Sequence, residues 1–322
     1  MSLVLMSCQT KTKQSADVRC EFSADSAYTY IESQMAFGSR VPGSEAHEKC
    51  GSWLAGELAR HGAQVKEQQG VMPDYAGQQQ VVRNIVGYLE GTGSPTVLLC
   101  AHWDTRPWTD EEANYEDRFD AVPGANDGAS GVGVILELVR QCAVRKAKGE
   151  YVPNLQVVFF DCEDMGTPAH YTGQQREHTW CLGSQLWGEE YKKSIDNQKG
   201  TQPLIQYGIL LDMVGDPSAT FPREYFSMRY AGGYVEQIWR TASRLGYGRY
   251  FVQQTTYYPI TDDHYYVSTL AGIPCVDVID YKPNTETGFA EWWHTRQDDM
   301  QNINKQTLQA VGETVLTTIC SK

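Results

Sequence analysis

Thr96-Val97-Leu98-Leu99-Cys100-Ala101 is a nearly unbroken apolar run that leads directly into His102-Trp103-Asp104. A short apolar run of this kind is typical of a strand that is buried on both faces, as strands in parallel sheets are. We therefore predict a buried strand over 96–101 whose carboxyl end carries an imidazole and a carboxylate.

Four further apolar runs have the same character, and helical patterns lie before and between them. The predicted strands are 81–89, 96–101, 155–161, 208–214 and 273–279, and the predicted helices are 26–37, 45–61, 128–144, 184–191, 234–245 and 305–319. This alternation predicts an α/β fold: one domain with a central, mostly parallel or mixed β-sheet flanked by helices. In such folds the functional groups gather at the carboxyl ends of the strands.

The composition limits the class of protein. The 322 residues include 27 Lys and Arg against 40 Asp and Glu, a formal net charge of −13. Nucleic-acid binding depends on clustered basic residues, so we expect no nucleic-acid partner. No window approaches the roughly 20 apolar residues of a membrane span, so we expect no transmembrane segment. The cysteines show no CxxC spacing, which argues against a thiolate zinc site or a redox pair.

The first residues resemble the end of a bacterial lipoprotein signal. Small and apolar residues precede Cys8, and a polar run follows it. This pattern predicts a lipid anchor at Cys8 and a location in the bacterial periplasm or at the cell surface. An incidental cysteine in a frayed leader stays open as the alternative. We assign residues 1–25 to a leader and linker, and 26–322 to the folded domain.

Carboxylates and imidazoles follow several of the predicted strands. They are His102 and Asp104, Asp127, Glu163 and Asp164, Asp212, Asp262 with Asp263 and His264, and His294. If these groups meet at one edge of a sheet, they repel or desolvate one another at a large cost unless a cation or protons compensate them. A bound metal ion is the economical explanation.

Zinc accepts imidazole nitrogen and carboxylate oxygen, and a catalytic zinc site has three protein ligands and one open position. Asp127, Asp164 and His294 are the predicted ligands. Each also has an ordinary interpretation: Asp127 as a helix cap, Glu163-Asp164 as a solvated pair, and His294 as a packed histidine bonded to a backbone carbonyl. His102 and Asp104 could form only a hydrogen-bonded pair. All of these ordinary interpretations must hold at once for the zinc hypothesis to fail.

Taken together, these motifs resemble those of zinc-dependent aminopeptidases and, more closely, those of the glutaminyl cyclases of bacterial and animal type. The segments that carry the resemblance, in family order, are 38–44, 101–107, 124–131, 160–164, 211–212 and 293–295. It extends from about Ser26 to the C-terminus, and a set of motifs in order is far more specific than any one of them. The resemblance implies a zinc aminopeptidase-like domain over 26–322.

The family's residues transfer to this chain position by position. The resemblance implies one zinc ion per chain, bound by Asp127, Asp164 and His294, with Glu163 as the general acid and base. Asp212 and Asp262 would be further catalytic residues. The substrate pocket would be walled by Trp293, Phe289, Ile260 and Trp180, and His102 and Asp104 would be the remnant of a second metal site.

The implied reaction converts the N-terminal glutamine of peptides or proteins into pyroglutamate with release of ammonia. One departure from the animal enzymes matters: Asp277 replaces a histidine that bonds the residue matching Asp262. We therefore expect a carboxyl–carboxyl contact between Asp262 and Asp277 that shares a proton.

Two other functions stay open. The aminopeptidases of the same group hold two zinc ions and hydrolyse N-terminal residues, although the segment after Asp212, the 262–264 element and Trp293 favour the cyclases. The second is a surface-anchored binding module that has lost the chemistry. The motive for this alternative is the aromatic content of 8 Trp and 19 Tyr, which could serve ligand binding.

Overall fold

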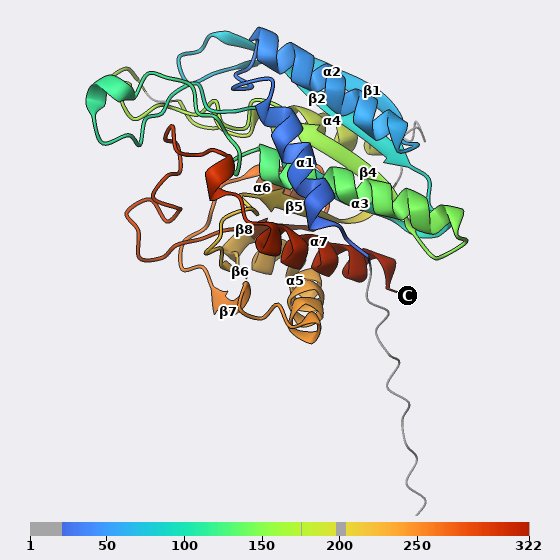
Figure 1. The fold of residues 1–322 in the computed structure, drawn as a ribbon. Helices are drawn as coiled ribbons and strands as arrows, with labels where there is room; N and C mark the ends of the chain where they lie inside the picture. Colours follow the sequence, from blue (N-terminus) through green and yellow to red (C-terminus); the bar gives the residue numbers. More distant parts are fainter. Residues whose placement is uncertain (1–20, 175, 198–203, 322) are drawn as a thin grey trace, which may run out of the picture.

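The computed structural model describes residues 21–174, 176–197 and 204–321, and Cys8 lies outside them. In this part of the chain one mixed sheet forms the centre (Figure 1). Its strands, in spatial order, are β1 (Gln64–Pro73), β2 (Gln79–Leu89), β4 (Pro153–Phe160), β3 (Gly93–His102), β5 (Ile205–Asp212) and β8 (Cys275–Ile279). β4, β3, β5 and β8 run parallel, and β2 and β1 extend the sheet in antiparallel pairing. The carboxyl ends of four strands therefore meet at one edge.

Helices cover both faces of this sheet. One face packs against α1 (Ala24–Met35), α2 (Glu45–Arg60), α3 (Ala129–Ala147), α5 (Tyr225–Leu245) and α7 (Lys305–Cys320). The other face packs against α4 (Leu182–Asp196) and α6 (Asp263–Thr269). Shorter elements are the parallel pair β6 (Phe221–Arg223) and β7 (Phe251–Thr255) and the 3-10 turns η1 (Tyr115–Asp117) and η2 (Met300–Asn302). None of the described helices is long and apolar enough to cross a membrane.

The apolar run 96–101 shows why both faces of the sheet are covered. Successive side chains of a strand point to opposite faces. Val97, Leu99 and Ala101 accordingly join the larger core, whereas Leu98 and Cys100 join the core beneath α4 and α6. Because both sets are fully buried, the strand reads as a continuous apolar run.

The predicted fold class is confirmed, and so are all five predicted strands, within a few residues at each end. β1 was missed because it is a polar edge strand with many exposed residues. The helix predicted over 234–245 begins earlier, at Tyr225. The prediction missed its first part because the sequence pattern is interrupted by two glycines, which directly follow a backbone kink at Ala231. The boundary between leader and domain stays a prediction.

Helix α3 lies unusually close to the sheet at Gly131. A Cβ atom at this position would stand 2.0 Å from the carbonyl oxygen of Leu211 and 3.0 Å from the Cβ atom of Ala101. Only glycine allows this approach, which places the start of α3 directly beside the ends of β3 and β5. The residues just before α3 are thereby held at the functional edge.

Gly131→Ala should therefore lower the free energy of unfolding by at least about 1–3 kcal/mol, the usual cost of overpacking a core. Gly233→Ala on α5 is the matched control, because its new Cβ would meet no atom within 4 Å. We expect the control to be neutral or slightly stabilising, since alanine favours helix. Urea unfolding of both variants tests this, and equal stability of the two would contradict the close approach.

Candidate metal centre and active site

Strained turns carry the polar residues away from the strand ends. Cys162, Met213 and His294 adopt positive φ angles of 55°, 49° and 54°. Non-glycine residues rarely adopt this backbone conformation, and it tends to occur at functional sites. Each of these three residues belongs to the predicted site or directly adjoins it in sequence.

The structure brings the three predicted zinc ligands together. The Nε2 atom of His294 lies 3.4 Å from Oδ2 of Asp127 and 3.2 Å from Oδ1 of Asp164. All three side chains are buried, with exposed fractions of 5% or less. Each offers one ligand atom within 4.8 Å of the other two. The site residues were a prediction from sequence, and the geometry is consistent with it.

The donor set fits a zinc ion. Oδ2 of Asp164 is buried and has no hydrogen-bond partner among the described residues, as expected of an oxygen reserved for a cation. Burial alone lowers the pKa of a histidine, but the carboxylates around His294, Asp164 first, raise its pKa to about 10. The metal-free cluster thus demands positive charge, and two carboxylates with one imidazole are ligands that zinc accepts.

The ordinary interpretations of these residues are wrong. Gly128 is the N-cap residue of α3, and no side chain of the described residues caps this helix, so Asp127 is not a cap. Asp164 is buried rather than solvated. The imidazole of His294 faces carboxylates on both nitrogens rather than a backbone carbonyl.

A second group shares Asp127 with the first. The Nε2 atom of His102 lies 2.9 Å from Oδ1 of Asp127 and 3.2 Å from Oδ1 of Asp212. These three residues form a second cluster that could hold a metal ion. Asp104, which we had paired with His102 as the remnant of a metal site, lies outside this cluster. Its carboxylate is 3.5 Å from Nδ1 of His102 and accepts hydrogen bonds from the backbone amides of Glu163 and Asp164.

Glu163 lies beside the first cluster but is not part of it. The thiol of Cys181 donates a 3.1 Å hydrogen bond to its Oε1 atom. Burial, reinforced by the carboxylates of Asp262 and Asp164, raises the pKa of Glu163 well above its usual range. A carboxyl group with a raised pKa can both accept and donate a proton near neutral pH.

Arg106 and Asp110 form a buried pair behind His294, which the sequence analysis missed. The guanidinium of Arg106 donates to both carboxylate oxygens of Asp110 at 2.7 and 2.6 Å, and it stacks on Trp180. Oδ1 of Asp110 lies 3.6 Å from Nδ1 of His294. Asp110 is therefore placed to orient the imidazole, as carboxylates behind histidine ligands commonly do. Its one sequence signal was its position in the long acidic and aromatic loop after Arg106.

The loop that carries Asp127 is clamped by two further residues. The carboxylate of Asp298 accepts hydrogen bonds from the backbone amides of Asn126 and Asp127 at 2.7 and 3.0 Å. Arg40 is fully buried and donates to the carbonyl oxygens of Pro123 and Gly124, both at 2.6 Å. Sequence reasoning missed these residues because a backbone clamp leaves no local pattern.

Asp262 and Asp277 are near one another, but the direct contact that we expected is wrong. No hydrogen bond joins the two carboxylates in the described part of the chain. His264 lies between Asp277 and Glu224 instead. Its Nδ1 atom lies 3.4 Å from Oδ2 of Asp277, and its Nε2 atom lies 2.9 Å from Oε2 of Glu224. Burial, with the charge of Asp262 and Glu224, raises the pKa of Asp277.

A cavity of about 940 Å³ opens onto the first cluster. It is lined by all of the predicted substrate-pocket residues, namely Trp180, Ile260, Phe289 and Trp293. The ring of Trp293 stacks on His294 at 3.5 Å, and Phe289 packs against Trp293 at 4.7 Å. Glu163, Asp212 and Asp262 also line this cavity, so the structure gathers the predicted catalytic residues around one space.

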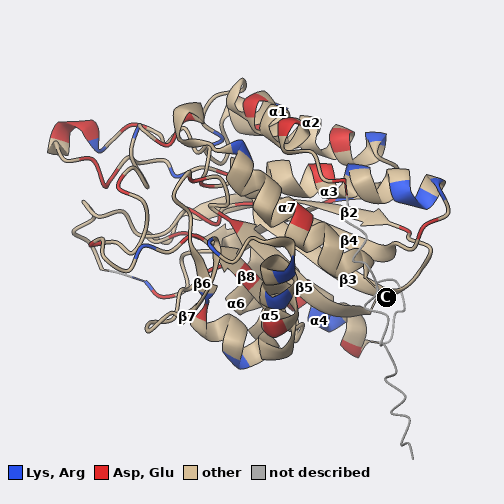
Figure 2. Ribbon diagram, turned by 60° about the horizontal axis from the view of Figure 1, so that its bottom comes forward, with Lys and Arg blue, Asp and Glu red and all other residues tan. Residues whose placement is uncertain are grey.

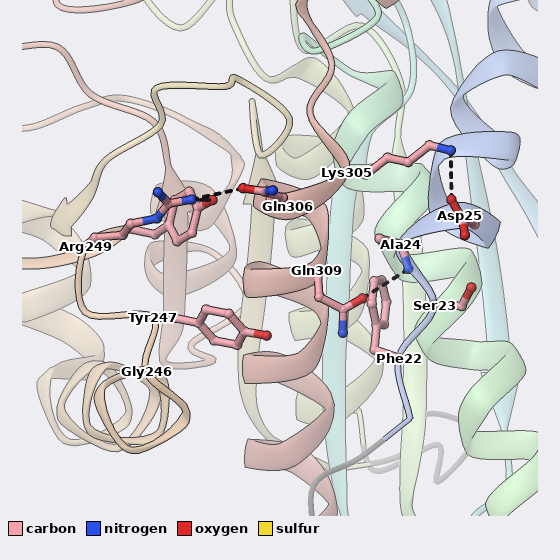
Figure 3. A pocket seen from close by; sticks show the side chains of 11 residues that line it. Phe22, Ser23, Ala24, Asp25, Gly246, Tyr247, Arg249, Lys305, Gln306 and Gln309 are labelled. Atoms are coloured by element: carbon pink, nitrogen blue, oxygen red, sulfur yellow. Dashed lines mark hydrogen bonds and ion pairs between the residues drawn. The ribbon is translucent and has the colours of Figure 1, made fainter.

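A second cavity, of about 680 Å³, lies between Phe22–Asp25, α7 and the residues after α5 (Figure 3). Asp25 pairs with Lys305 at 2.7 Å, and the backbone amide of Ala24 donates to Gln309. None of the described residues that line it is a histidine or a cysteine. It has no resemblance to a catalytic centre.

A parallel-centred α/β sheet with a buried carboxylate–imidazole cluster at its strand ends defines a metal-dependent enzyme. Comparison with known proteins gives the family. The chain belongs to peptidase family M28, whose model matches residues 84–319.

Solved structures of high similarity carry two different descriptions. Tannerella forsythia glutaminyl cyclase is 46% identical, with a TM-score of 0.86 over 94% of this chain and 99% of that one. A Zn-dependent exopeptidase from Parabacteroides distasonis is 44% identical, with a TM-score of 0.86 over 95% of this chain and 100% of that one. The glutaminyl-peptide cyclotransferase of Bos taurus is 25% identical over 71% of this chain, which spans 63% of that protein's length.

The position of Asp110 generates a prediction about metal affinity. Asp110→Asn removes the charge that faces Nδ1 of His294, so we expect zinc affinity to fall by about 10–100-fold, the usual effect of losing such a partner. Titration against a chromophoric chelator measures this. Asp196→Asn, on the exposed surface of α4, is the control and should not change the affinity. Unchanged affinity in a folded Asp110→Asn protein would show that Asp110 does not orient the ligand.

Proposed function

We propose that this protein is a glutaminyl-peptide cyclotransferase that uses one zinc ion and converts N-terminal glutamine of peptides or proteins into pyroglutamate and ammonia. The observation that carries the proposal is the placement of Glu163. Its carboxyl group has a raised pKa, lines the aromatic cavity and is held by Cys181 beside the zinc ligands. The similarity to the Tannerella forsythia cyclase over nearly the whole chain supports it.

The reaction needs a proton shuttle. The substrate's α-ammonium group must lose a proton before its nitrogen can attack the γ-amide carbon, and the departing amide nitrogen must gain one to leave as ammonia. Glu163 takes the first proton and gives it to the leaving nitrogen, and the attacking nitrogen loses its second proton to solvent as it becomes the neutral lactam N–H. One Glu163 oxygen is anchored by the Cys181 thiol, so the carboxyl group keeps its orientation through both transfers.

The remaining residues position the substrate. Asp212 and Asp262 line the cavity next to Glu163 and accept hydrogen bonds from the reacting amine and amide. Trp293, Phe289, Ile260 and Trp180 exclude water from the reacting atoms. A zinc ion, when bound by Asp127, Asp164 and His294, supplies a Lewis acid for the γ-carbonyl group. Because the attack is intramolecular, holding the side chain folded contributes much of the rate.

A two-zinc aminopeptidase is the second candidate, because His102, Asp127 and Asp212 form a second complete cluster. The relative described as a Zn-dependent exopeptidase is consistent with it. A second zinc ion at this cluster would convert the site to one that activates water. The number of zinc ions therefore separates the two functions.

We also infer that the protein is exported and carries a lipid at Cys8. The support is the sequence before this cysteine, which resembles a lipoprotein signal. Labelling with a fatty-acid analogue in a bacterial host, with Cys8→Ser as the comparison, tests this proposal.

Peptides that begin with glutamine should lose ammonia and gain a pyroglutamate end when mixed with the zinc-loaded protein. A strong chelator should abolish the reaction, because the carboxylate–imidazole cluster depends on its cation. Mass spectrometry of the peptide, an ammonia assay and elemental analysis of the protein give the three readouts. We expect one zinc ion per chain.

Release of free N-terminal residues without pyroglutamate, together with two zinc ions per chain, would identify the aminopeptidase instead. A protein that binds such peptides equally well without metal, and changes neither end of them, would identify the binding module.

Glu163→Gln and Asp164→Asn should separate the roles of two adjacent residues. Glu163→Gln keeps the shape of the side chain but cannot carry a proton, so we expect turnover to fall by about 10²-fold or more with zinc retained. Asp164→Asn removes a ligand, so we expect zinc and activity to be lost together. Activity and metal content are measured on the same preparations. A zinc-free Glu163→Gln protein, or a fully active one with zinc bound, would show that the division of roles is wrong.

A further inference from the structure

The cavity at the active site is larger than one glutamine residue needs. Its volume of about 940 Å³ lies at the upper end of the range that holds drug-sized ligands. If the N-terminal glutamine fills the inner part beside Glu163, the following residues of the peptide must leave through the outer part. The chemistry of that outer part therefore acts on the second and third residues of the substrate.

The outer part of the cavity is acidic. None of the described residues that line the cavity is lysine or arginine, whereas Glu177 and Glu286 stand at its exposed side together with His178, whose Nδ1 atom is 3.1 Å from the hydroxyl of Tyr266. Neither carboxylate has an ion-pair partner among the described residues. Figure 2 shows acidic and basic residues interspersed in the loops at this end of the molecule.

The basic residues closest in sequence to Glu286 and Glu177 are Lys282 and Arg176, and a third basic residue, Arg106, lies behind the site. Lys282 lies 3.1 Å from Asp280 and 3.6 Å from Asp216. Arg106 is buried in its pair with Asp110. The guanidinium of Arg176 lies against Gly77, in the turn between β1 and β2. None of these three basic residues forms an ion pair with Glu177 or Glu286 in the described part of the chain.

Aromatic side chains also line the outer part of this cavity. Tyr258 lines the cavity with 68% of its surface exposed. Phe226 and Tyr265 also line it, and their ring centroids are 4.6 Å apart. Exposed ring faces attract cations and other aromatic rings. An acidic and aromatic opening favours basic and aromatic side chains and repels carboxylates.

We propose that the enzyme selects peptides in which the residues directly after the N-terminal glutamine are basic or aromatic, and that it discriminates against acidic ones. This substrate class rests on the proposed cyclase function. Glu177 and Glu286 are the specificity-determining charges, and the rings of Tyr258, Phe226 and Tyr265 provide the surface on which the second and third residues stack.

The test uses peptides of equal length that begin Gln-Arg, Gln-Phe, Gln-Ala or Gln-Glu, with the rate of pyroglutamate formation measured as kcat/KM on the zinc-loaded enzyme. We expect kcat/KM for the Gln-Arg peptide to exceed that for the Gln-Glu peptide by about 5–20-fold at low ionic strength, because the charge of the second residue interacts with two carboxylates near the protein surface. At about 0.5 M salt the ratio should fall to roughly twofold, because exposed charges are screened. Gln-Phe should exceed Gln-Ala.

Two variants and a matched control locate the charges. Glu177→Gln and Glu286→Gln should each lower the Gln-Arg to Gln-Glu ratio by about 2–4-fold, and the double variant should bring it close to one. Glu90→Gln makes the same charge change on an exposed residue at the opposite ends of the strands, where it pairs with Lys146. It should leave the ratio unchanged.

The outcomes separate this inference from the proposed function. Pyroglutamate formation at equal rates from Gln-Arg and Gln-Glu peptides overturns the inference and leaves the cyclase assignment intact. A preference that persists in the double variant overturns the roles of Glu177 and Glu286. Absence of pyroglutamate from every peptide overturns the proposed function itself.

Discussion

The repulsion among buried carboxylates at the ends of the parallel strands is the constraint on which the rest of the structure depends. The sheet brings Asp127 within 4.8 Å of Asp164 in one cluster and of Asp212 in the other, and burial raises the pKa of Asp212 to about 7. Such crowding is stable only if cations and protons compensate it. His102 supplies part of the positive charge, and the predicted zinc ion, bound by a neutral His294, supplies the remainder.

The same edge is held in place by carboxylates that bond to the backbone. Asp104, Asp161 and Asp298 each accept hydrogen bonds from backbone amides of the turns that carry site residues. A carboxylate is suited to this task because one side chain can hold two amides at once. The acids of the strand ends therefore have two uses: some face the cavity, and others fix the backbone that aims them.

The sequence could predict the parallel strands and the residues at their ends because both leave a local signal. A strand buried on both faces must be apolar throughout, and a polar residue at its end stands out, as His102 and Asp212 do. Roles that depend on pairing in space left no such signal. Asp104 is only two residues from His102 in sequence, yet the cluster is completed by Asp212 from the neighbouring strand. His264 likewise lies beside Asp277, a proximity that no spacing indicates.

The two clusters that share Asp127 each keep one buried atom without a hydrogen-bond partner among the described residues: Nδ1 of His102 in one and Oδ2 of Asp164 in the other. In the cluster of His102, Asp127 and Asp212, the imidazole lies within hydrogen-bond distance of both carboxylates. Burial lowers the pKa of a histidine, but these carboxylates and Asp104 raise the pKa of His102 well above its usual range, so its proton can take the place of a metal ion. In the cluster of Asp127, Asp164 and His294, Oδ2 of Asp164 keeps no partner in the described part of the chain. That free carboxylate oxygen is the donor that the first cluster offers to a cation, and the number of ions that the two clusters hold distinguishes the two proposed functions.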